Sequence, residues 1–193
     1  RKSLAIIPQE PVLFSGTLRF NLDPFEEFED EDVWDTLKKC KLYEFVHEKA
    51  EKLNYEVSEG GANFSAGQKQ LICIGRALLK RSKVLLLDEA TSSIDKHTDS
   101  LIQALIRKEF VNVTVICIAH RLETILDYDR ILVLSNGNIQ EFDTPTNLLN
   151  KGAESVFYQM VNSAHKDDVE ENSKSQRDQV DVIEEEESEE NDD

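Results

Sequence analysis

Residues 83–95 read KVLLLDEATSSID, and this stretch decides the fold. The four consecutive apolar residues from Val84 to Leu87 predict a strand that is buried on both faces. The strand runs directly into two carboxylates, Asp88 and Glu89. Ligands of a parallel sheet bind beyond the carboxyl ends of its strands, so these two acids lie where a functional site is expected.

Strand and helix patterns alternate on both sides of this stretch. Apolar strands are predicted at residues 4–7, 83–87, 114–119 and 130–134, the last with a hairpin partner at 139–142. Apolar residues at helical spacing predict helices within residues 23–58 and at 65–79, 98–110 and 148–161. This alternation predicts an α/β fold in which a parallel sheet is flanked by helices.

The negative charge is concentrated towards the carboxyl end of the chain. The 193 residues carry a formal net charge of −17, and the 14 acidic and 3 basic residues from His165 onward account for −11 of it. Residues 165–193 contain few apolar side chains, so we expect a disordered acidic tail, either simply solvated or serving as a docking or phosphorylation segment. The acidic balance argues against nucleic acid as a partner.

Three widely spaced cysteines, Cys40, Cys73 and Cys117, form no CxxC pair. We expect buried, reduced thiols in a cytosolic domain rather than disulfides or metal ligands. No apolar run reaches the ~18 residues that a membrane span needs, and no signal peptide is recognisable. Because the chain begins at Arg1 in the middle of a pattern, we expect it to be a piece of a longer protein.

The two acids after the central strand have functional and structural interpretations. A buried Asp88 needs a partner, which is either a magnesium ion on a nucleotide or a structural Lys or Arg. Glu89, one residue on, can point elsewhere and polarise a water molecule. A positioned general base of this kind contributes roughly 10² to 10⁴ in rate.

The stretch Ser65-Ala66-Gly67-Gln68 also has two interpretations. As a capping box, Ser65 caps a helix and Gln68 reaches back to it, which contributes about 1 kcal/mol. That interpretation leaves Gly67 unexplained, because glycine in a first turn weakens a helix. Alternatively, glycine lets an anion approach the free N–H groups closely, and this helix start holds a phosphate.

Two further polar residues follow apolar strands. His120 comes after the strand TVICIA, and Gln9 comes after Leu4–Ile7 and Pro8. A lone residue in such a place is often structural. Polar groups at the ends of three strands and one helix of the same sheet, however, favour a common site.

Together these residues resemble the nucleotide-binding domain of ABC ATPases, a P-loop NTPase type. The stretches IIPQEP, FSAGQ, VLLLDEATSSID and AHR occur in the order of the Q-loop, the signature motif, Walker B with D-loop, and the switch-histidine loop. The resemblance covers residues 1 to about 162. IIPQEPVLFSGTLRFNLDPF and IAHRLETILDYDRILVL are similar to subfamily C, the multidrug-resistance-associated exporters. Glu89, and the end of the chain soon after the domain, favour the second of the two nucleotide-binding domains.

The resemblance implies that four residues surround one Mg²⁺–ATP. Gln9 would contact magnesium or the attacking water and sense the membrane domains, and Asp88 would hold magnesium. Glu89 would orient and activate the water, and His120 would contact the γ-phosphate. Catalysis of this kind works by positioning and charge neutralisation.

The resemblance implies a second group that acts on a partner domain. Ser65, Gly67 and Gln68 would clamp the γ-phosphate of ATP held by the other nucleotide-binding domain, and Asp95 would lie at the interface of this ATP-sandwich dimer. Two departures are mild: the signature reads FSAGQ rather than LSGGQ, and the D-loop reads SSID rather than SALD.

A larger departure is that no glycine in the chain is followed by lysine, so the Walker A loop G-x-x-x-x-G-K-[ST] is absent. The family places that loop upstream of the Q-loop. We therefore expect residues 1–164 to be a nucleotide-binding domain without its first part, with a helical subdomain at about 20–82, and to be inactive alone.

The whole protein would then couple ATP hydrolysis to export of organic anions or conjugates. Its partners would be the other nucleotide-binding domain and the transmembrane domains, at the cytoplasmic face of a plasma or vacuolar membrane. Two alternatives remain open. One is a non-catalytic module that completes a partner's ATP site through Ser65, and the other is a DNA-repair or chromosome ATPase head, which would need long inserted helices.

Overall fold

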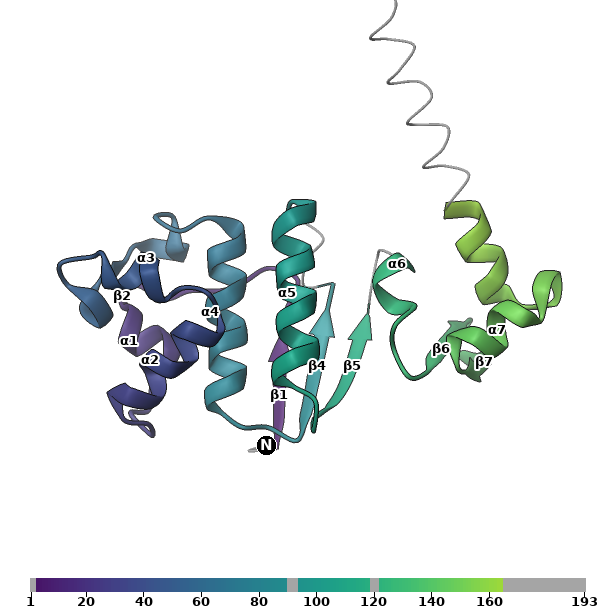
Figure 1. Ribbon diagram of the computed structural model, residues 1–193, viewed down its shortest axis with the longest axis horizontal. Coiled ribbons are helices and arrows are strands. Elements are labelled where there is room, and N and C mark those ends of the chain that lie inside the picture. Colours follow the sequence, from purple (N-terminus) through teal and green to yellow (C-terminus); the bar gives the residue numbers. More distant parts are fainter. Residues whose placement is uncertain (1–2, 90–93, 119–121, 165–193) are drawn as a thin grey trace, which may run out of the picture. The chain divides into compact units, whose positions relative to one another are not determined.

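The computed structural model describes residues 3–89, 94–118 and 122–164 (Figure 1). Two compact units divide the chain, the first up to His120 and the second from Arg121. The predicted disordered tail, residues 165–193, lies outside the described residues.

Three parallel strands form the sheet of the first unit, in the order β1-β4-β5. They are β1 (Leu4–Ile7), β4 (Val84–Asp88) and β5 (Thr114–Ile118), which confirms three of the predicted strands. The register aligns Ile6 with Leu86 and Leu86 with Ile116. The carboxyl ends of all three strands therefore meet at one edge of the sheet.

One face of this sheet is covered by two long helices, α4 (Ala66–Leu79) and α5 (Lys96–Glu109), which stand beside it in Figure 1. The strand residues that face them are buried; they are Ala5, Ile7, Leu85 and Leu87. Apolar burial of this kind stabilises a fold by about 25 cal/mol per Å² of area removed from water. Helix α5 begins two residues earlier than expected, because Asp95 caps it.

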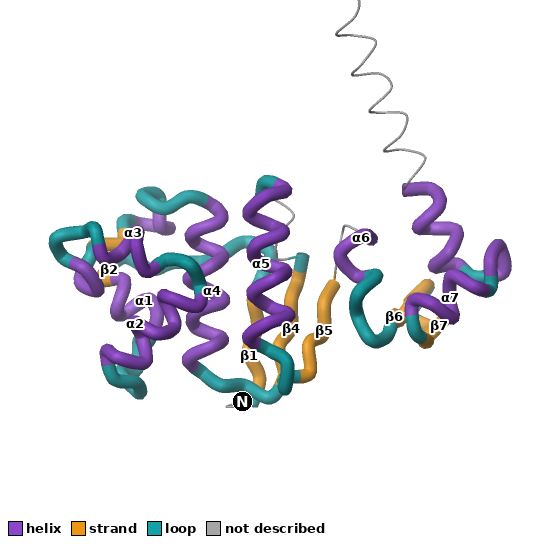
Figure 2. Tube along the Cα trace, in the orientation of Figure 1, coloured by secondary structure: helices purple, strands orange, loops and turns teal. Residues whose placement is uncertain are grey.

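The elements between β1 and α4 are mainly short helices joined by loops, as the tube in Figure 2 shows. The elements here are β2 (Gly16–Thr17), α1 (Leu18–Leu22), α2 (Asp30–Lys39), α3 (Tyr43–His47), η1 (Lys52–Asn54), β3 (Glu56–Val57) and η2 (Glu59–Gly61). The short strands β2 and β3 pair antiparallel. This region and α4 occupy the range predicted for a helical subdomain.

The second unit contains an antiparallel hairpin, β6 (Ile131–Ser135) and β7 (Asn138–Asp143). Its helices are α6 (Leu122–Ile125), α7 (Pro145–Asn150) and η3 (Gly152–Glu154), and residues 156–164 are also helical. A small core forms around Leu148, Phe157 and Ile131. The hairpin that the Asn136-Gly137 turn predicts is confirmed.

The prediction of a single closing helix at 148–161 is wrong, because the α-helix is interrupted between the end of α7 and residue 156. Gly152 has a left-handed φ of +59°, which ends the helical path. Ser155 is extended, and its hydroxyl accepts a bond from the Tyr158 N–H, which starts a new helix.

None of the three cysteines forms a disulfide in the structure. Cys40 and Cys73 are buried, and burial raises the pKa of the Cys40 thiol to about 12. Cys117 is half-buried. In the described ranges, no helix is long and apolar enough to span a membrane.

Candidate functional site

The central strand ends on Asp88, whose side chain is exposed rather than buried as expected. Asp88 is the last residue of β4 and lies opposite Ile118 of β5. Among the described residues, no cation or hydrogen-bond donor contacts its carboxylate. In this part of the chain, a structural Lys or Arg partner for Asp88 is therefore not found.

Glu89 leaves the strand in an unusual backbone conformation. Its φ is +44°, in the left-handed region, which costs a non-glycine residue roughly 1–2 kcal/mol. Its backbone N–H donates to the carbonyl of Ile118 at 2.9 Å, which holds this conformation. Strain of this kind is common at functional sites, because it aims a side chain in a direction that regular structure does not allow.

Gln9 and Glu89 meet directly, although 80 residues separate them in sequence. The Gln9 amide Nε2 donates to Glu89 Oε2 at 3.1 Å. Gln9 follows β1 and Glu89 follows β4, so the parallel pairing of these neighbouring strands brings the two side chains together. The structure thus joins two of the predicted site residues at the carboxyl edge of the sheet.

The capping box predicted for Ser65 and Gln68 is confirmed. The Gln68 N–H donates to Ser65 Oγ at 3.1 Å, and the Ser65 N–H donates to Gln68 Oε1 at 2.9 Å. The Ser65 hydroxyl accepts in this arrangement, so its own O–H proton is still available as a donor. Ser65 is exposed, and capping does not exclude a contact with an anion.

Gly67 has a packing explanation that the sequence interpretation missed. A Cβ atom at this position would lie 2.7 Å from Cγ2 of Thr98, a distance that real Cβ atoms essentially never show. Thr98 lies in the first turn of α5, so a side chain at position 67 would push the two helices apart. Close approach of α4 and α5 is therefore sufficient to require glycine here.

Asp95 caps α5. Its Oδ1 accepts from the Thr98 N–H at 2.9 Å. Hydrogen bonds from the Thr98 N–H and then from the Thr98 hydroxyl lower the pKa of Asp95. The signal for this cap is the spacing of an Asp and a Thr three residues apart ahead of an amphipathic helix.

The amino ends of α4 and α5 lie at the same end of the first unit as the carboxyl ends of the strands, uppermost in Figure 1. Helix amino ends carry free N–H groups and partial positive charge, which suit a phosphate. His120, the remaining predicted member, lies outside the described residues.

Sequence reasoning missed Gln70, which is fully buried on α4. Its Nε2 is 3.5 Å from the carbonyl oxygen of Pro8, the residue before Gln9. The signal for it is a polar residue on the inward-facing, otherwise apolar side of the helix. Gln70 connects the helix that begins with Ser65 to the loop that carries Gln9.

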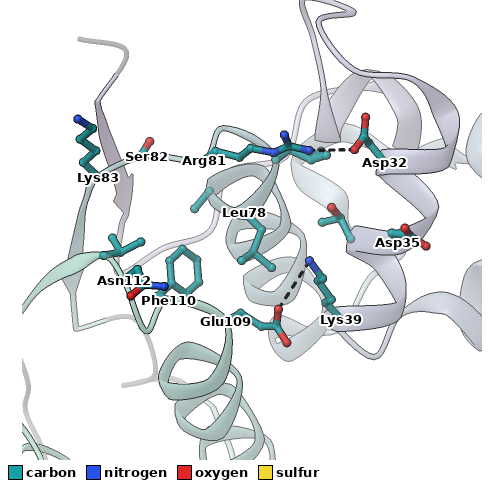
Figure 3. Close-up of a pocket in the computed structure, with 14 residues that line it drawn as sticks. Asp32, Asp35, Lys39, Leu78, Arg81, Ser82, Lys83, Glu109, Phe110 and Asn112 are labelled. Carbon is teal, nitrogen blue, oxygen red and sulfur yellow. Dashed lines mark hydrogen bonds and ion pairs between the residues drawn. The ribbon is translucent and has the colours of Figure 1, made fainter.

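A cavity of about 490 Å³ lies at the opposite end of the first unit (Figure 3). It is lined by Lys83 and Val113, which precede β4 and β5. Arg81 pairs with Asp32 at 3.0 Å beside it. None of the predicted site residues lines this cavity, so it is separate from the candidate site.

The donor set at the carboxyl edge fits magnesium. Mg²⁺ takes oxygen ligands, and in nucleotide sites it is held by one or two protein side chains plus phosphate oxygens. Asp88 and Gln9 offer such oxygens. No cluster of three or more His, Cys, Asp or Glu occurs in the described part of the chain, so these residues do not form an all-protein metal cage.

Comparisons with known proteins identify the class of domain. The family model for ABC transporters matches residues 1–92. A solved structure of a bacterial Atm1-family ABC exporter with ATP bound has a TM-score of 0.76 and 33% identity, over 85% of this chain and 28% of that one. The chain thus carries an ABC transporter ATP-binding domain, and the predicted α/β fold is confirmed.

Curated relatives place it further. The chain is 54% identical over 164 residues to ATP-binding cassette sub-family C member 3 of Rattus norvegicus, covering 85% of this chain and 11% of that protein. It is 55% identical over 161 residues to ABC transporter C family MRP4 of Zea mays, covering 83% and 11%. It is therefore related to the subfamily C, or multidrug-resistance-associated, proteins, and spans about 11% of the length of these relatives.

Proposed function

We propose that the chain forms the ATP-binding and ATP-hydrolysing cassette of a subfamily C exporter, in the second of its two nucleotide-binding domains. The observation that carries the catalytic part is the 3.1 Å hydrogen bond between Gln9 and Glu89. It joins the candidate water-activating carboxylate to the loop that the family resemblance assigns to sensing the membrane domains. The presence of Glu89 favours the second domain.

Four residues perform the chemistry in this proposal. Asp88 and Gln9 would hold Mg²⁺, which would neutralise charge on the phosphates. Glu89 accepts a proton from the attacking water, and the hydrogen bond from Gln9 keeps its carboxylate oriented. His120 contacts the γ-phosphate. The protein contributes mainly positioning and electrostatic stabilisation, as phosphoryl transfer requires.

The other cluster acts on the partner domain. The Ser65 hydroxyl donates a hydrogen bond to the γ-phosphate of ATP bound to the other nucleotide-binding domain. The first-turn N–H groups of α4 point at the same phosphate. Gln68 contributes through its side-chain amide, and Asp95 lies at the interface between the domains. The confirmed capping box supports this arrangement, because it fixes the first turn of α4 before any ligand binds.

The cargo and the location are part of this proposal and rest on the family resemblance. One relative is named a probable multidrug resistance-associated protein, and another an ABC transporter of the C family. We infer export of organic anions or conjugates, with this cassette at the cytoplasmic face of a plasma or vacuolar membrane. Its partners are the other nucleotide-binding domain and the transmembrane domains of the same transporter.

The test is ATP hydrolysis by the full-length transporter in vesicles, with Glu89→Gln as the key variant. This change keeps the size of the side chain and removes the base, so we expect the rate to fall by about 10²-fold or more while ATP still binds. The matched control is Glu44→Gln, an exposed carboxylate on α3, which should leave the rate unchanged.

The same measurement separates the alternatives. If Glu89→Gln leaves hydrolysis intact but Ser65→Ala abolishes it, the chain is a non-catalytic module that completes a partner's site. If neither variant changes hydrolysis, the proposed function is wrong. Several relatives, among them proteins of Zea mays and Arabidopsis thaliana, are named ABC transporters, and nothing in the described region favours a DNA-repair or chromosome ATPase head.

A further inference from the structure

Thr98 contacts both helix starts of the partner-facing cluster. Its Cγ2 methyl would lie only 2.7 Å from a Cβ atom added at position 67. This is tighter than the contact of any other helical glycine described in the chain: a Cβ at Gly75, on the same helix, would approach Leu22 Cδ2 at 3.1 Å. A Cβ atom at position 67 would therefore require Thr98 or one of the two first turns to move.

The other γ-substituent of Thr98 serves Asp95. The Thr98 N–H donates to Asp95 Oδ1 at 2.9 Å, and a hydrogen bond from the Thr98 hydroxyl is among the causes that lower the pKa of the Asp95 carboxyl. Threonine is branched at Cβ, so its hydroxyl and its methyl rotate together about one χ1 angle. A rotamer that satisfies Asp95 therefore also fixes where the methyl lies against Gly67.

We propose that Thr98 is a positioning residue that sets the spacing between the first turn of α4, with Ser65 and Gln68, and Asp95 at the start of α5. This inference rests on the proposed function, in which both groups act on the ATP and the interface of the partner domain. Gly67 is then glycine because of Thr98, and not only because a phosphate approaches it.

The spacing matters because both helix starts must reach the same partner. A misplacement of about 1 Å by a remote change can cost about 10²-fold in rate. A side chain at position 67 cannot be accommodated by a backbone hinge, since α4 and α5 are both packed on the sheet through buried residues such as Ile72 and Ile102. The displacement would appear at the amino ends instead.

The experiment is a compensation test in the full-length transporter. Gly67→Ala adds the clashing Cβ, and we expect kcat for ATP hydrolysis to fall by about 10²-fold. Thr98→Ser removes Cγ2 but keeps the hydroxyl for Asp95. The double variant Gly67→Ala/Thr98→Ser should therefore recover about tenfold or more of that loss.

Two control pairs also combine a Gly→Ala change on α4 with a change at Thr98. Neither should recover kcat. In Gly67→Ala/Thr98→Val a methyl group still occupies the Cγ2 position, so the clash remains. In Gly75→Ala/Thr98→Ser the three atoms nearest to the added Cβ belong to Leu22, Thr36 and Cys40, and none belongs to Thr98. The amount of folded transporter is measured for every variant, because a purely structural effect lowers that amount without changing kcat per folded molecule.

The outcomes are distinct. The positioning role is supported if Thr98→Ser restores kcat in the Gly67→Ala background and neither control pair shows such a recovery. If the double variant is as slow as Gly67→Ala, the glycine is required by the phosphate and the proposal is overturned. If Glu89→Gln hydrolyses ATP as fast as the wild type, the proposed function itself fails, whatever the Thr98 variants do.

Discussion

At the residue scale, the most informative contact is that between Gln9 and Glu89. An amide that donates to a carboxylate leaves the negative charge in place and fixes its direction. The strained φ of Glu89 and the bond from its N–H to Ile118 fix the backbone of the same residue. Side chain and backbone are thus held independently, as pre-organisation for general-base chemistry requires.

This contact predicts an order among substitutions of Gln9. Gln9→Ala removes one charge-assisted hydrogen bond and should slow ATP hydrolysis by about tenfold. Gln9→Glu has nearly the shape of the native residue but places a second carboxylate within hydrogen-bond distance of Glu89. Repulsion should turn Glu89 away and slow the reaction by about 10²-fold. The measurement is kcat in vesicles, and the reverse order would show that the Gln9 amide does not orient Glu89.

At the element scale, Asp23 organises the turn that leads from α1 towards α2. It is nearly fully buried and accepts from the N–H groups of Glu27 and Phe28 at 3.1 and 2.9 Å. Arg19 pairs with it at 3.0 Å. Burial alone would raise the pKa of Asp23, but the donors from Phe28, Glu27 and Arg19 outweigh it, so the pKa is lowered.

Asp23→Asn should therefore destabilise the fold by about 3 kcal/mol at pH 7, because a half-buried Arg19 and two N–H groups lose a charged, buried acceptor. A lowered pKa means that the stability from Asp23 is complete above its ordinary value near 4 and is lost as the pH falls through the lower value. The gap between wild type and variant should shrink below about pH 4.

Urea unfolding of the purified chain at several pH values measures this gap. The control is Asp35→Asn on α2, whose exposed carboxylate pairs with Lys38 at 3.1 Å and should contribute less than about 1 kcal/mol. Equal losses for the two variants would contradict the role of Asp23.

At the scale of the whole molecule, the sheet of the first unit has one open face. Leu4, Ile6, Ile116 and Ile118 point away from α4 and α5, and Ile6 is 60% exposed. Parallel sheets are normally covered on both faces. An exposed apolar face indicates a surface that another segment or partner covers in the working protein.

A second prediction at this scale concerns the purified 193-residue chain. It should fail to hydrolyse ATP, because its sequence contains no Walker A loop to bind the phosphates. The assay is phosphate release with Mg²⁺–ATP, with full-length transporter as the positive control. Hydrolysis by the chain that Glu89→Gln abolishes would show that the phosphates are held in another way.

Local sequence patterns predicted the strands β1, β4 and β5 and the helices α4 and α5, and they offered the capping box at Ser65 as one of two interpretations. These features are predictable because apolar periodicity lies within a single strand or helix, and the two residues of a capping box are three positions apart. The ordered motifs from Gln9 to His120 likewise indicated the family before any coordinates.

Only the tertiary structure decided what meets across long separations. The bond between Gln9 and Glu89 depends on the pairing of β1 with β4, and the contact of Gly67 with Thr98 depends on how α4 docks beside α5. The exposure of Asp88 also followed from the sheet edge and not from its apolar neighbours. Strand register and helix docking are set by the packing of the whole core, which no short stretch of sequence contains.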